Sequence, residues 1–120
     1  MDSIALAQRI ASILYDKKAQ DIIALNVGHM TVITDCMVIA SGRSAIQVKA
    51  LADEVDDQLS KDGIEPRRTE GHNDGRWIVI DYGYVIVHIF HQEERGFYHL
   101  ERLWEDGSNR LVLPFSQDED

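Results

Sequence analysis

The sequence predicts an α/β fold: a single domain in which helices pack on a sheet of about five strands. Apolar residues recur every three or four positions in residues 4–14 and again in 48–59, the spacing of one face of a helix. Short β-branched apolar runs, typical of strands, lie between and after these segments. With 120 residues, 44% of them hydrophobic, the chain is long enough to bury one core without disulfides or a structural metal.

Two amphipathic helices are expected in the first half of the chain. The first should begin after Asp2 or Ser3, and its apolar stripe consists of Ile4, Ala7, Ala11 and Leu14. The second should begin after Ser44 and end near Gly63. Its apolar stripe consists of Val48, Leu51, Ala52, Val55 and Leu59, and the acidic residues of DEVDD should face water.

The strands are expected in two pairs and at one edge. DIIALNV and DCMVIAS are separated by a short loop, and WIVID and YVIVHIF by a tight turn at Tyr82 and Gly83. Pro66 confines any strand in IEPRRTEG to an edge or to a strand start. WIVID and YVIVHIF are continuous apolar runs, so we expect them to be covered on both faces, by helices on each side or by a partner over one face.

The segment EERGFYHLERLW is expected to form one further helix. Phe97, Leu100 and Trp104 would share a face, and Glu93 and Glu94 would lie favourably at its N-terminus. Gly96 weakens the prediction for the first turn. Residues 105–120 are then an acidic tail whose apolar island, LVLPF, docks on the body or extends the sheet, and whose extreme end is expected to be disordered.

Composition restricts the class of function. The net charge of −9 disfavours binding along a phosphate backbone and suits a basic protein partner. Cys36 is the only cysteine, so no disulfide can form within the chain, and its apolar surroundings indicate a buried thiol. No leader-like basic region and no long apolar span is found near the start, so a soluble cytoplasmic protein without a membrane partner is expected.

The histidines near the end of the chain do not form a recognisable metal site. His88 and His91 are an odd number of residues apart, so in a regular strand they face opposite sides, about 10 Å apart along the chain. If the strand broke after Phe90, His91 could instead approach Glu93 or Glu94, but the sequence has no H-E-x-x-H pair. We therefore expect no metal.

Catalytic motifs are also missing. SGRSA is a turn of the kind that precedes the carboxylates of nucleotidyltransferases, but Asp35 and Asp81 each lack a second carboxylate two residues away. No nucleophile elbow and no phosphate-binding loop is present, and capping of the following helix accounts for Ser44. An unusual or degenerate nucleotidyltransferase remains the alternative function, and an RNA-binding adaptor a weaker one.

Four blocks in order resemble the ribosomal silencing factors, also called the Iojap-like family. The blocks are DIIALNV, ITDCMVIASGRSAIQVKALADEV, EGHNDGRWIVIDYGYVIVHIF and ERGFYHLERLW, and together they span roughly residues 20–104. The resemblance implies a domain over residues 1–104 with a mixed sheet and a topology similar to nucleotidyltransferases, without their catalytic carboxylates. His99 and the long acidic tail depart slightly from the family's common pattern.

The resemblance also implies a function. Family members bind the large ribosomal subunit through the fourteenth large-subunit protein, block joining of the small subunit and so lower translation when nutrients are scarce. It implies no catalysis, no cofactor and no sequence-specific nucleic-acid contact, and several members are similar in forming homodimers. The partner surface is expected on the last two strands and the following helix, at Trp77, Asp81, Tyr82, His88, Phe90, Arg95, Tyr98, Leu100, Glu101, Arg102 and Trp104. Tyr98 is the preferred anchor, because its ring can be buried while its hydroxyl still bonds.

Overall fold

The computed structural model describes residues 2–117 as an α/β domain with one five-stranded sheet. The helices are α1 (Ser3–Asp16), α2 (Ala45–Ser60), α3 (Gln92–Tyr98) and α4 (Leu100–Trp104). The strands are β1 (Gln20–Asn26), β2 (Cys36–Gly42), β3 (Arg68–Glu70), β4 (Trp77–Asp81) and β5 (Val85–His91). The strand order is β1-β2-β5-β4-β3, and β2 and β5 are parallel while the other neighbours are antiparallel. The expected mixed sheet is confirmed.

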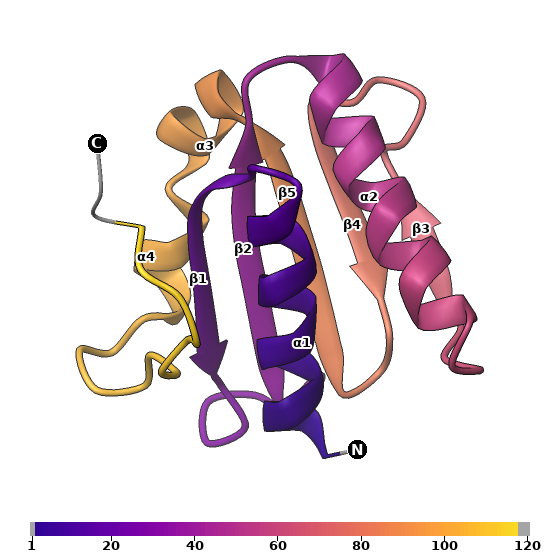
Figure 1. Cartoon of the computed structure of the whole chain (residues 1–120). Coiled ribbons are helices and arrows are strands. Elements are labelled where there is room, and N and C mark those ends of the chain that lie inside the picture. The colour runs from indigo at the N-terminus through magenta and orange to yellow at the C-terminus, as the bar shows by residue number, and fades with distance from the viewer. Residues whose placement is uncertain (1, 118–120) are drawn as a thin grey trace.

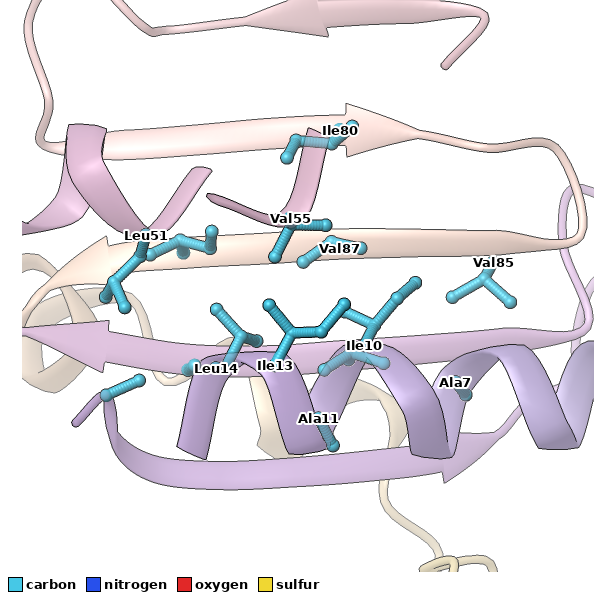
Figure 2. Packing of buried hydrophobic residues seen from close by; sticks show 14 of the residues in the cluster. Ala7, Ile10, Ala11, Ile13, Leu14, Leu51, Val55, Ile80, Val85 and Val87 are labelled. Atoms are coloured by element: carbon cyan, nitrogen blue, oxygen red, sulfur yellow. The ribbon is translucent and has the colours of Figure 1, made fainter. Parts of the chain in front are cut away.

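Helices α1 and α2 lie side by side over one face of the sheet (Figure 1). Asp2 and Ser44 cap them, each accepting a hydrogen bond from the backbone N–H three residues on. Their apolar stripes meet the inward side chains of the strands in the larger core, where Ile10, Leu51 and Val87 are almost fully buried (Figure 2). Both helices therefore form as the sequence predicts, except that Ile4, expected in the apolar stripe of α1, is 40% exposed.

The opposite face of the sheet is only partly covered. Its smaller core consists of Ile23, Leu25, Val27, Met37, Ile39 and Phe90. Leu100 and Trp104 of α4 pack on this core, together with Trp77 of β4, and all three keep part of their surface exposed. On this face the packed side chains therefore cover β1, β2 and one end of β5, and they leave β4 partly uncovered.

Strand β4 departs from the expectation that it is covered on both faces. Ile78 and Ile80 are buried, whereas Trp77, Val79 and Asp81 are each partly exposed. Strand β5 comes closer to the expectation, since five of its seven residues are buried and only Ile86 and His91 are partly exposed. One face of the apolar strand β4 is thus not fully covered by other parts of the described chain.

The single helix expected over EERGFYHLERLW is wrong, because the segment forms two short helices. His99 adopts a left-handed conformation, with φ 49° and ψ 46°, and ends α3 one residue before α4 begins. Gly96, the expected weak point, is helical. The break turns Phe97 outward, with 76% of its surface exposed, while Leu100 and Trp104 still pack inward.

Residues 109–117 dock along the open edge of β1. The backbone N–H of Leu111 donates to the carbonyl of Ala24 at 2.8 Å, and the side-chain amide of Gln117 pairs with both backbone groups of Ile22. Phe115 stacks on Tyr15 of α1 with ring centroids 4.2 Å apart. The LVLPF island therefore docks on the body, and the disorder expected for the extreme end concerns residues 118–120, which lie outside the described residues.

The two edges of the sheet differ in how they avoid further pairing. The edge of β1 is covered by the docked tail, whereas β3 at the other edge is three residues long, fully exposed and preceded by Pro66. Short edge strands with a nearby proline and charged side chains discourage pairing with another chain. The edge position predicted from Pro66 is confirmed.

Replacing Phe115 by Ala should lower the free energy of unfolding by about 1.5 kcal/mol, because the half-buried ring loses its contact with Tyr15 and the larger core. Val112→Ala is the matched control, since that side chain is 82% exposed and should change stability by less than about 0.5 kcal/mol. Urea unfolding followed by circular dichroism measures both. Equal effects would mean that the tail does not pack as described.

Candidate functional site

The partly covered face of the sheet is the candidate functional site. Trp77 and Val79 of β4 and Ile86 of β5 lie on it with part of their surfaces exposed. The register pairs Trp77 with Phe90 and Val79 with His88, so these side chains form two adjacent rows across the strands. An apolar face bordered by polar residues, which the chain leaves partly open, is typical of a surface that binds another macromolecule.

Backbone contacts at the start of β4 fix the position of Trp77. Gly71 adopts φ 84°, and a Cβ at this position would lie 2.0 Å from the carbonyl oxygen of Trp77, so only glycine allows this approach. Arg76, the preceding residue, donates to Glu94 of α3 at 2.8 Å and to Glu93 at 3.4 Å. The strand that carries Trp77 is thus tied to the helix that lies beside it.

Three aromatic rings form a continuous exposed cluster, here called the aromatic cluster and defined as Trp77, Phe97 and Tyr98. The ring centroids of Trp77 and Tyr98 are 5.1 Å apart, and those of Phe97 and Tyr98 are 5.0 Å apart in an edge-to-face arrangement. Tyr98 is 49% exposed and Phe97 is 76% exposed. The expected single helix placed Phe97 on one face with Leu100 and Trp104, but the break at His99 separates it from them.

Arg95 holds the α3–α4 corner from beneath. Its guanidinium donates to both carboxylate oxygens of Glu101 at 3.2 Å and to the hydroxyl of Ser41, on β2, at 2.8 Å. Only 8% of Arg95 is exposed, so its charge is desolvated and balanced by Glu101. Arg95 and Glu101 therefore position the corner, and neither is free to contact a partner with its charged group in this conformation.

His88 is the buried polar residue of this face. Its Nδ1 lies 3.1 Å from the indole Nε1 of Trp77, and its Nε2 is buried without a hydrogen-bond partner among residues 2–117. Burial lowers the pKa of the imidazole to about 4, because the charged form would lose its hydration. The ring is therefore neutral near pH 7.

The remaining residues expected to bind a partner divide by exposure. Arg102 is exposed, and Asp81, Leu100 and Trp104 are partly exposed. Phe90 is completely buried and supports Trp77 from the neighbouring strand, with ring centroids 4.8 Å apart. Tyr82 is buried in the larger core and so lies away from the aromatic cluster. The carboxylate of Asp81 accepts from the backbone N–H of Gly83 and thereby closes the β4–β5 turn.

Groups considered for catalysis have structural partners. Ser44 caps α2, Ser41 accepts from Arg95, and Asp35 accepts from the hydroxyl of Ser3. Cys36 is buried at the start of β2, which raises the pKa of its thiol through desolvation. Across residues 2–117, no three His, Cys, Asp or Glu side chains are grouped so that they could hold a metal ion. In the same part of the chain, no helix has the length and apolar character needed to cross a bilayer.

Comparison with known proteins gives one consistent result. A family model described as "Ribosomal silencing factor during starvation" matches residues 1–120. The ribosomal silencing factor of Bacillus subtilis is 39% identical over 106 residues, covering 88% of this chain and 90% of that protein. That of Halalkalibacterium halodurans is 42% identical over 106 residues, covering 88% and 91%. A mitochondrial Iojap-related protein of Arabidopsis thaliana is 29% identical over 114 residues, which cover 91% of this chain and 61% of that protein.

Solved structures agree with this result. A crystal structure of a Chromobacterium violaceum protein has a TM-score of 0.84 and 32% identity, covering 99% of this chain and 98% of that one. A second, from Bacillus halodurans, has a TM-score of 0.75 and 38% identity, covering 91% and 95%. With the family model matched over its full length and several relatives well above 30% identity, the chain belongs to the ribosomal silencing factor family.

Proposed function

We propose that this chain silences ribosomes by binding the large subunit through its fourteenth protein and obstructing the joining of the small subunit. Translation would then fall when nutrients are limited. Membership of the ribosomal silencing factor family supports a role in ribosome silencing and translation regulation. The observation that carries the finer proposal is the partly covered sheet face with its aromatic cluster, because a folded domain gains little from leaving such a face open unless a partner covers it.

The chemistry of this surface suits a protein partner. Aromatic side chains bury a large area at low cost in side-chain entropy and tend to dominate the energetics of interfaces. Around the aromatic cluster, Glu93 is exposed, and the chain as a whole carries a net charge of −9. A basic ribosomal protein would therefore be attracted over a distance and then held by apolar contact.

Obstruction needs only steric overlap, so the proposal requires no catalytic group, no cofactor and no direct reading of nucleic-acid sequence. The two carboxylates considered for nucleotidyl transfer each accept a hydrogen bond within the chain. Asp35 accepts from the hydroxyl of Ser3, and Asp81 accepts from the backbone N–H of Gly83. A homodimer is part of the proposal as well, and equilibrium sedimentation of the purified chain tests it separately.

The direct test is to mix purified large and small subunits with and without the chain and to follow joined ribosomes by sucrose-gradient sedimentation. We expect fewer joined ribosomes and comigration of the chain with the large subunit. Equal joining in both samples would refute obstruction, and comigration with the small subunit alone would refute the choice of partner.

Tyr98→Ala should weaken binding to the large subunit by about 1 kcal/mol or more, roughly a fivefold loss of affinity, because a half-exposed ring beside Trp77 would be buried by the partner. Ile46→Ala is the matched control, since Ile46 is 82% exposed on α2, at the other face of the sheet. Affinity is measured by titration with labelled protein, and circular dichroism verifies folding. Unchanged affinity of folded Tyr98→Ala would move the interface elsewhere.

Acidification should destabilise the chain through His88. Because the folded pKa is about 4 and the ordinary value is 6.5, only the unfolded chain gains a proton there between these limits. The free energy of unfolding should therefore rise with pH across this window, by at most about 1.4 kcal/mol per pH unit from this group, and then level off. Urea unfolding at several pH values measures the slope.

His88→Gln should reduce that slope, whereas His72→Gln, which alters a partly exposed histidine paired with Asp53, should retain it. An unchanged slope in His88→Gln would show that His88 titrates normally in the folded chain.

A further inference from the structure

The contact with Trp77 fixes which nitrogen of His88 carries the proton. An indole N–H can only donate, so the Nδ1 atom that lies 3.1 Å from the Trp77 Nε1 must accept. A neutral imidazole has one accepting and one donating nitrogen. Its proton therefore resides on Nε2, and this N–H is the only hydrogen-bond donor of the His88 ring.

That donor has no acceptor within the part of the chain that the structure describes. Nε2 is buried, and only 8% of His88 is exposed. Its neighbours across the strands are the apolar residues Ile39 and Val79, and the ring nearest along its own strand is Phe90. A buried N–H without an acceptor is costly, and such groups are rare in folded proteins, so this one calls for an explanation.

His88 lies at the boundary of the covered area. Ile39, on one side, is completely buried within the smaller core, whereas Val79, on the other side, is partly exposed. Trp77, whose indole bonds to His88, belongs to the aromatic cluster itself. The unpaired donor is therefore next to the surface assigned to the partner and not deep in the larger core.

We propose that the partner protein supplies a hydrogen-bond acceptor to the Nε2–H of His88, so that this buried donor is satisfied only in the complex. The acceptor is an oxygen, of a backbone carbonyl or of a hydroxyl, amide or carboxylate side chain. The inference rests on the proposed function, because it names the chemistry that the partner must bring to the same surface.

The requirement for an acceptor adds specificity to an otherwise apolar contact. A lysine or arginine placed over His88 would leave two donors facing each other, and an aliphatic group would leave the N–H buried without a partner. The enclosed position of Nε2 means that a side chain must shift before the acceptor arrives.

Nitrogen-15 NMR of the histidine side chains tests the inference on the unaltered chain. In the free chain we expect an unprotonated Nδ1 and a protonated Nε2 at His88. On addition of purified fourteenth large-subunit protein, the Hε2 proton should move downfield and exchange more slowly with water. A complex that forms while the Hε2 signal stays unchanged would overturn the inference.

A substitution provides the second measurement. His88→Leu removes the unpaired donor and also the acceptor of the Trp77 indole N–H, so the two effects on stability oppose each other and the melting temperature should change little. Its affinity for the fourteenth protein should drop about tenfold through loss of the new hydrogen bond. His72→Leu, which alters a histidine paired with Asp53 away from this face, should leave affinity unchanged. Equal affinity of folded His88→Leu and the unaltered chain would overturn the inference. If His88→Leu fails to fold, the NMR experiment decides.

The two proposals fail in different ways. If the unaltered chain binds neither the fourteenth protein nor intact large subunits, the proposed function fails and takes the inference with it. If the unaltered chain binds with normal affinity but the His88 signal and the Leu variant show no change, only the inference fails.

Discussion

The parallel pairing of β2 with β5 is the constraint on which the rest of the structure depends. Seven residue pairs, from Cys36 with Val85 to Gly42 with His91, join the two strands in one direction. Parallel neighbours need a long crossover, which here includes α2 and the two antiparallel strands β3 and β4. The carboxyl ends of both strands lie at the same end of the sheet, so α2 and α3 begin close together. There Arg95 of α3 donates to the hydroxyl of Ser41 at the end of β2.

The contact between Arg95 and Ser41 determines how much of the sheet face opposite α1 and α2 is covered. Arg95 is satisfied by Ser41 and Glu101, and this holds α3 against β5 and β2 and positions α4, whose Leu100 and Trp104 complete the smaller core. Two helices of seven and five residues cannot also reach across β4. The open strip beside them is therefore a consequence of helix length and anchoring, and the rings at its margin come from the same short corner.

Most of the framework could be predicted from local patterns. The stripe of α2, its cap at Ser44, the turn at Gly83 and the edge position imposed by Pro66 each depend on residues close in sequence. The site was harder, because Arg95 finds Ser41 54 residues away and no local pattern reveals such a partner. His99 adopts the left-handed conformation, which glycine usually occupies, so the sequence carries no glycine to mark the end of α3. The spacing of Phe97, Leu100 and Trp104 therefore predicted one helix where there are two. Only one feature of the sequence indicated that one face of β4 is partly open: the strand is a continuous apolar run, but the sequence predicts too few helices to cover both of its faces.

The docking of residues 109–117 on β1 has a consequence for synthesis. Asn109 bonds to a residue 83 positions earlier, and Gln117 to one 95 positions earlier, so β1 leaves the exit tunnel long before the segment that closes its edge. Throughout that interval the nascent chain presents one unpaired edge of β1, on a polysome where neighbouring copies are close. The edge of β1 thus stays open until residues 109–117 have emerged, and the rate at which the ribosome translates the intervening residues sets how long that edge is exposed.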